Sequence, residues 1–207
     1  MKNYGNSFNK SAEQYNAGKI PIWLHTDEFY PAGCTLNGQK QGDTIPAGVP
    51  VYVSKMGAEA VVLETFEVVG AVGSTDTYVV LKSVGGFVQP AKDIVVGKAN
   101  NGVISKALAL PEVTSVGSGD HEGEYTFTIT ANALGTLSDG DILVVAVEAG
   151  SNKAQAFPTG LLLEDVYIGN VGATGTVVTK GQVLAKRIPA IPAAYKPYLT
   201  GITFVNE

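Results

Sequence analysis

Hydrophobic and polar residues alternate along much of the chain with a period of two, which is typical of strands with one wet face. In EYTFTITANAL, residues 124–134, the apolar Tyr125 and Phe127 alternate with threonines. Residues 64–72 and 77–84 are two further β-rich runs around a polar turn, which predicts a hairpin. The pattern therefore predicts an all-β chain with little helix.

A short turn followed by a strand recurs three times. In each copy a glycine follows polar or turn-forming residues, and we expect it to take the positive φ of a tight turn. The copies are GDTIPAGVPVYVS (residues 42–54) with Gly48, LSDGDILVVAV (137–147) with Gly140, and VTKGQVLAKRI (178–188) with Gly181. Because they are short, they indicate a shared local device and not a duplicated domain.

The order of these elements divides the chain into three parts. We expect residues 1–41 to form an N-terminal arm and apolar anchor, residues 42–66 plus 138–207 to form a small β-barrel or sandwich core, and residues 67–137 to form an inserted β-rich subdomain. The composition agrees, since 25 glycines and 10 prolines among 207 residues suit strands joined by tight turns.

The N-terminal part contains a polar segment and an apolar one. Residues 1–19 are polar with isolated aromatics, whereas KIPIWLHTDEFY (19–30) is too apolar for a free tail. We interpret residues 1–19 as a binding arm, with a merely disordered terminus as the alternative. The candidate binding residues of the arm and anchor are Tyr4, Phe8, Tyr15, Ile22 and Trp23.

The C-terminal stretch RIPAIPAAYKPYLTGITFVNE (187–207) combines prolines with apolar side chains. The prolines hold the backbone extended and prevent a long helix. The resulting stiff apolar surface is either core or a subunit interface. The interface residues predicted on the second reading are Pro189, Ile191, Pro192, Tyr195 and Tyr198.

Charge and composition exclude several classes of partner. A net charge of −5 argues against nucleic acid, because phosphate binding needs a cationic face. No apolar run approaches the roughly 20 residues that span a bilayer, so we expect no membrane insertion. The N-terminus has no apolar signal core, which predicts no export by that route. Cys34 is alone and can form no internal disulfide, which fits folding in a reducing cytoplasm.

Residues that could perform catalysis are scarce. Neither His25 nor His121 has a second His or a Cys at metal-ligand spacing. The chain has no nucleophile elbow, phosphate-binding loop or dinucleotide fingerprint. Cys34 has no base or positive charge beside it in the sequence, so we expect a buried, unreactive thiol. We therefore predict no enzyme activity, no catalytic residues, no metal and no cofactor.

Two acidic segments are the remaining candidates for a cation. Residues 120–124, DHEGE, could offer carboxylate oxygens, and so could Asp139 and Asp141. The simpler interpretations are a solvated loop for the first and a turn before a strand for the second, and we favour these.

A third acidic pair, Glu164 and Asp165, lies within GLLLEDVYIG (160–169). An enzymatic reading would make the pair an acid and a base. Adjacent residues of a strand point to opposite faces, so the pair could not converge on one substrate without a bulge. We expect it to lie where the strand leaves the core or bends.

The order of the C-terminal elements resembles that of tailed-phage head decoration proteins of the lambdoid kind and of phage head-fibre proteins. In that family a G-[IL]-L strand with an acidic residue and a valine after it leads into a G-x-[VL] strand, a proline-containing connection and a terminal G-[IA]-x-[FI]-V strand. The matching segments here are Gly160–Val166, Gly181–Leu184, Pro189–Pro192 and Gly201–Val205, with IPAGVPVYV around Gly48 before them.

The resemblance implies a small β-rich fold that assembles as a homotrimer on the outside of a phage or prophage capsid, with the major capsid protein as its partner. It also implies synthesis in the host cytoplasm and an N-terminal arm that adds to a sheet of the shell. This chain is longer than minimal decoration proteins and more apolar after residue 19, and both departures fit a head-fibre version. A host-surface glycan is a further candidate partner.

Two other classes remain as alternatives. A β-sandwich carbohydrate-binding or adhesin-like module would usually carry several exposed aromatics and an export signal, and this chain has one tryptophan, Trp23. An enzyme would require residues 120–124 to come together with His25, which nothing in the sequence predicts.

Overall fold

The structure is a computed structural model that describes residues 21–206 except 31–32, 38–40, 43, 56–58, 85–89, 91, 101–102, 119–120, 122 and 170–172. Nearly all of its regular elements are strands, as the alternating pattern predicts. They are β1 (Trp23–Phe29), β2 (Cys34–Asn37), β3 (Thr44–Ile45), β4 (Pro50–Lys55), β5 (Glu59–Val62), β6 (Thr65–Val68), β7 (Tyr78–Val84), β8 (Val95–Asn100), β9 (Val103–Ala109), β10 (Val113–Val116), β11 (Glu124–Thr128), β12 (Ile142–Val145), β13 (Gly160–Leu162), β14 (Val166–Tyr167), β15 (Ala173–Gly175), β16 (Val177–Leu184) and β17 (Ile202–Val205). Two 3-10 turns, η2 (Ala185–Arg187) and η3 (Lys196–Tyr198), follow β16.

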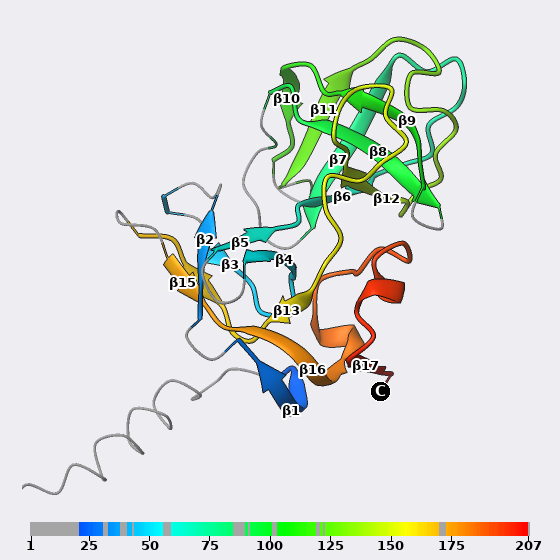
Figure 1. Ribbon diagram of the computed structural model, residues 1–207. Helices are drawn as coiled ribbons and strands as arrows, with labels where there is room; N and C mark the ends of the chain where they lie inside the picture. Colours follow the sequence, from blue (N-terminus) through cyan, green and yellow to red (C-terminus); the bar gives the residue numbers. More distant parts are fainter. Residues whose placement is uncertain are drawn as a thin grey trace, which may run out of the picture.

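The first sheet has eight strands and curls into a half-barrel (Figure 1). Its order is β1-β16-β13-β4-β5-β2-β15, and β17 pairs with β16 outside this path. The β2–β5 and β16–β17 pairs are parallel, and the other pairs of this sheet are antiparallel. Strands β3 and β14 form a separate two-stranded sheet. The fold class predicted from the sequence, all-β with barrel-like and sandwich-like sheets, is confirmed.

The central strands of the first sheet are buried on both faces. Leu161 and Leu162 of β13 are each fully buried, although neighbouring residues point to opposite faces. Leu161 packs with Val178 in one apolar cluster, whereas Leu162 packs with Val177 in another. Burial on both faces explains why GLLL is a continuous apolar run, whereas strands with one solvent-exposed face alternate apolar and polar residues.

The apolar segment after residue 19 joins the first sheet. Its strand β1 pairs antiparallel with β16, from Trp23 opposite Val183 to Phe29 opposite Val178. The indole N–H of Trp23 donates a hydrogen bond to the carbonyl of Leu163, 3.0 Å away. The described part of the predicted arm and anchor is therefore an edge strand of the core, and β2 is also part of that sheet.

The second sheet has seven strands in the order β10-β11-β7-β6-β12-β8-β9. The predicted hairpin is present as β6 and β7, with Thr65 opposite Val84. Its core lies on the face that carries Phe66, Leu81 and Phe127, all fully buried.

This sheet covers residues 67–137, the range expected for the inserted subdomain, and extends beyond that range at both ends. It begins with β6 at residue 65 and ends with β12 at residue 145. The expected division of the chain placed residues 138–145 in the core, because the apolar run at 142–147 resembles a core strand of either sheet.

Two of the three turn glycines take the expected conformation. Gly48 and Gly140 have φ angles of +82° and +78°, values that glycine adopts without a steric penalty. Gly181 does not, because it lies inside β16 and not in a turn before it. A Cβ at this position would lie 2.5 Å from the carbonyl oxygen of His25, so glycine is required there for the close approach of β1.

The C-terminal segment joins the two sheets. After β16 the chain rises towards β6 and β12 (Figure 1). Tyr195, 1% exposed, belongs to an apolar cluster with Leu63 between the sheets and with Ile104 and Val144 of the inserted sheet. Phe157, on the connection back to β13, meets the Tyr195 ring edge-on with centroids 6.5 Å apart.

We expect Tyr195→Ala to lower the free energy of unfolding by about 3–5 kcal/mol, because it removes a large buried side chain and leaves a cavity. The measurement is urea unfolding followed by tryptophan fluorescence and circular dichroism. Tyr198→Ala is the matched control, since that ring is 45% exposed and its stack on Phe157 is worth about 0.5–1.5 kcal/mol. Equal losses of unfolding free energy in the two variants would contradict the placement of Tyr195 in a buried cluster that joins the two sheets.

Candidate functional site

The acidic pair Glu164 and Asp165 lies in the bend between β13 and β14. The Asp165 carboxylate accepts a hydrogen bond from the backbone N–H of Ala47, 2.9 Å away. The next residue, Gly48, donates its N–H to the carbonyl of Leu162 at 2.8 Å. Asp165 therefore ties the turn before β4 to the end of β13, as the structural interpretation of the pair predicts.

Asp139 and Asp141 are likewise part of turns. Asp139 accepts a hydrogen bond from the N–H of Gly70 at 2.7 Å. Asp141 accepts the N–H of Ser138 at 2.7 Å and the ammonium of Lys98 at 2.6 Å. These carboxylate oxygens accept hydrogen bonds from backbone N–H groups and a lysine, which favours the interpretation as a turn over the interpretation as a calcium site.

Asp141 has a perturbed pKa. Its burial acts to raise the pKa, but the hydrogen bonds from Lys98 and Ser138 and the charge of Lys98 outweigh burial, so the pKa is lowered. The charged carboxylate is thus favoured in the folded state.

The histidines do not form a shared site. His121, on the loop between β10 and β11, lies 3.0 Å from the carboxylate of Glu124, the first residue of β11. Asp120 and Glu122 lie outside the described residues. His25 on β1 contacts Asp27 at 2.6 Å. Strand β1 belongs to the first sheet, whereas β10 and β11 belong to the inserted sheet, well away from β1 in Figure 1, so His121 and Glu124 do not come together with His25.

Cys34 is fully buried in the first sheet, and burial raises the pKa of its thiol. A buried neutral thiol is a poor nucleophile. Within the described ranges, no three His, Cys, Asp or Glu side chains are grouped in a way that could hold a metal ion. The same residues contain no helix long and apolar enough to cross a membrane.

Among the predicted capsid-binding residues, Tyr4, Phe8 and Tyr15 lie outside the described residues. Ile22 and Trp23 are half-buried, and Trp23 packs against the core of its own chain. The exposed apolar side chains of this segment are instead Leu24 and Phe29, at 55% and 50%. Sequence reasoning missed this distinction because it depends on the register of β1 against β16.

The residues predicted for a trimer interface divide into two groups. Pro192 and Tyr195 are buried within one chain, and Ile191 packs against the clusters on both sides of the junction. They thus form core, the other interpretation of this stretch. Pro189 is half-buried and Tyr198 is exposed, so these two remain the candidates for contact with another subunit.

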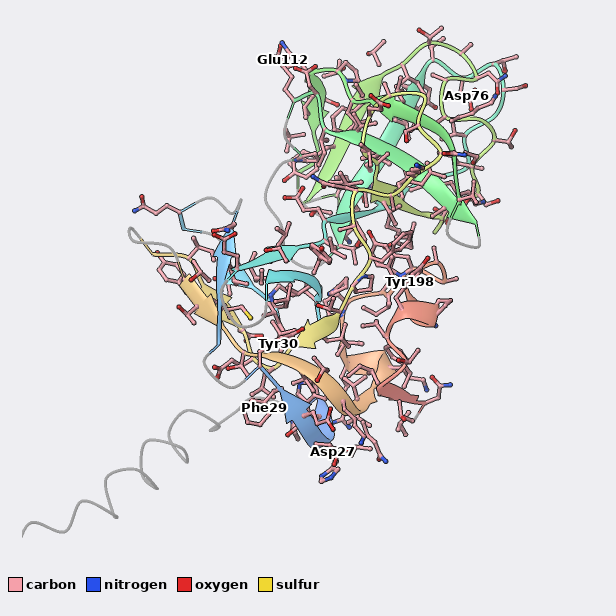
Figure 2. The ribbon with its side chains drawn as sticks, in the orientation of Figure 1. Asp27, Phe29, Tyr30, Asp76, Glu112 and Tyr198 are labelled. Carbon is pink, nitrogen blue, oxygen red and sulfur yellow. The ribbon has the colours of Figure 1, made fainter. Side chains whose placement is uncertain are left out.

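Strand β1 and part of the inserted sheet lie at the two ends of the molecule. Figure 2 shows Asp27 and Phe29 on β1 at the end farthest from Asp76 and Glu112 of the inserted sheet, with Tyr198 between.

Comparison with family models, with curated proteins and with solved structures finds no match. The candidate surfaces therefore rest on the geometry of this chain.

Asp165→Ala should lower the free energy of unfolding by about 1 kcal/mol, because it leaves the Ala47 N–H without its carboxylate partner. Glu164→Ala is the matched control at the neighbouring exposed position and should change stability by less than about 0.5 kcal/mol. Urea unfolding at neutral pH measures both. A larger loss of unfolding free energy from Glu164→Ala than from Asp165→Ala would contradict the assignment of Asp165 as the residue that holds the turn.

Lys98→Met should lower stability at neutral pH by about 1–2 kcal/mol, because the Asp141 carboxylate loses a charged hydrogen-bond partner. A lowered pKa contributes stability that is present above the ordinary Asp range near pH 4 and is lost as pH falls below it. The gap between wild type and variant should therefore narrow below about pH 4.

Urea unfolding at several pH values measures this narrowing. Lys92→Met, which removes another lysine at an exposed position, is the control and should track wild type throughout. A gap that stays constant with pH would show that Lys98 stabilises the fold by packing alone.

Proposed function

We propose that this protein is a structural component of a phage or prophage virion that attaches to the outside of the capsid as a homotrimer. The observation that carries the proposal is the polarity of the molecule (Figure 1). The strand that follows the N-terminal segment lies at one end, and an inserted sheet lies at the other. Such a shape suits a protein that is anchored at its base and projects a second module outward.

The proposed anchor is the free side of β1. This strand pairs with β16 alone among the described strands, so it is an edge of the first sheet. Leu24 and Phe29 project apolar surface there, beside the charged Asp27 and Glu28. An edge strand can receive a strand from another chain, with apolar side chains filling pockets on the partner. The major capsid protein is the proposed partner.

The irregular register of β1 suits a selective contact. Its pairing with β16 shifts at three places between Trp23 and Phe29. Bulges twist an edge away from unspecific partners, so that a flat strand cannot simply extend the sheet. Attachment then requires a partner shaped to this edge, which fits a regular lattice site.

The proposed projection is held in a fixed direction. The apolar cluster around Tyr195 joins the inserted sheet to the C-terminal segment, and Phe157 stacks on Tyr198 with centroids 4.0 Å apart. A trimer repeats each capsid contact three times, so modest individual affinities combine into lasting attachment. The carboxylates that could have suggested catalysis are used to fasten turns, which favours a structural role over an enzyme.

Co-sedimentation with expanded capsids, assembled from the major capsid protein of the same genome, tests the proposal. We expect the full chain to pellet with capsids and to behave as a trimer by light scattering. The double variant Leu24→Ser, Phe29→Ser should weaken pelleting at least tenfold, since loss of two apolar contacts costs more than about 1.4 kcal/mol.

Tyr78→Ser is the matched control, because Tyr78 is 58% exposed on the inserted sheet and should leave pelleting unchanged. Deletion of residues 1–19 separates the arm from β1: unchanged pelleting would remove the arm from the proposal and leave β1 as the anchor. A full chain that stays in the supernatant, or that is monomeric at micromolar concentration, would refute the capsid or the trimer part respectively.

A further inference from the structure

The inserted sheet has two edge strands, β9 on one side and β10 on the other. The outer side of an edge strand presents backbone N–H and C=O groups that no neighbouring strand satisfies, so it can accept a strand from another chain. Proteins therefore cover, distort or charge most of their sheet edges. The two edges of this sheet differ in how far they are protected.

The β9 edge is covered by its own chain. Val103 forms an antiparallel bridge with Lys153 of the segment that follows β12. Gly150 of the same segment donates its N–H to the carbonyl of Ala107 at 2.9 Å. Lys106 has a φ of +50°, which interrupts the extended backbone of the strand. An incoming strand would therefore meet an occupied and irregular edge at β9.

The β10 edge is open within the ranges that the structure describes. Among these residues β10 pairs with β11 alone, and its one register shift lies between Val113 and Ser115. The strand contains neither the lysine nor the proline that commonly protects an edge. Thr114, Ser115 and Val116 are all exposed, Val116 at 57%. Strand β10 thus offers uncharged side chains beside an uncovered backbone.

The surroundings of this open edge are acidic. Residues 65–145, which span the inserted sheet, contain nine Asp and Glu residues, four lysines and no arginine, and so carry a formal charge equal to the net −5 of the whole chain. No lysine or arginine occurs in residues 107–128, which include β10 and β11, whereas Glu112 is exposed directly before β10. Pairing with a second copy of this edge would bring like charges together, which is unfavourable.

We infer that β10 is a docking edge for an extended segment of another protein that carries lysine or arginine. The backbone of the segment continues the sheet, its apolar side chains lie beside Val116, and its cations lie near Glu112. A strand of four residues offers few backbone bonds, so the contact is weak and charge contributes to its selectivity. Strand β10 lies far from β1 (Figure 1), so the inference goes beyond capsid attachment and does not rest on it.

Titration of the isotope-labelled full chain with three capped peptides, followed by NMR amide shifts, tests the inference. The peptides are KVTVTVTK, EVTVTVTE, which reverses the charges, and KVTPTPTK, which keeps the charges but lacks two backbone N–H groups. We expect KVTVTVTK to shift the amides of β10 and to bind at least fivefold more tightly than either other peptide at low salt. Its advantage over EVTVTVTE should shrink in about 0.5 M NaCl, because ions screen exposed charges.

Exposed valines on the two edges provide matched variants. Val116→Lys places a protective lysine on the open edge and should weaken binding of KVTVTVTK at least fivefold. Val103→Lys adds the same charge on the covered β9 edge, where Val103 is 54% exposed, and should bind as wild type does. Glu112→Gln should lower the preference for KVTVTVTK over EVTVTVTE at least twofold, because it removes the carboxylate beside the edge.

Four results would each overturn the docking edge. The first is an absence of binding by KVTVTVTK, or amide shifts that map outside β10. The second is binding of KVTPTPTK or EVTVTVTE as tight as that of KVTVTVTK, and the third is equal weakening by the two lysine variants. The fourth is a set of β10 shifts that grow with protein concentration without peptide, which would assign the edge to a second copy. Pelleting with capsids is measured separately and depends on none of these results.

Discussion

The packing of three strands around β16 is the constraint on which the first sheet depends. This strand pairs with β1 along one side and with β13 and then β17 along the other. Its successive residues Val177 and Val178 face two different apolar clusters, and both are fully buried. Such crowding leaves no room for a side chain at Gly181, next to the backbone of β1. Strand β1, the core of the first sheet and the C-terminal strand β17 therefore all depend on their packing against β16.

The acidic residues illustrate how local polar groups serve this architecture. Asp165 joins the turn at Ala47 to a bend 118 residues later in the chain, and Asp139 accepts a hydrogen bond from Gly70, which lies 69 residues before it. In each case the carboxylate provides the hydrogen-bond partner of a backbone N–H in a turn. Asp165 and Asp139 thus each link two segments that lie far apart in the sequence. Their spacing resembles that of catalytic or calcium-binding carboxylates only in the linear sequence.

The sequence pattern was informative wherever a strand has one wet face. The hairpin of β6 and β7 and the alternation in β11 follow directly from a period of two. The pattern failed where burial is two-sided or where register decides exposure. It placed the residues of β12 with the first sheet and Gly181 in a turn, and it could not separate Trp23, which faces the core, from Leu24, which faces solvent.

The pairing of β6 with β12 sets the way in which the second sheet is attached. These strands carry the chain into and out of that sheet, and Thr65 lies opposite Val144. Entry and exit are therefore neighbours, and the sheet packs around a core of its own. The inserted sheet therefore interrupts the first sheet at one place along the chain, between β5 and β13, and leaves the strand pairing around β16 unbroken.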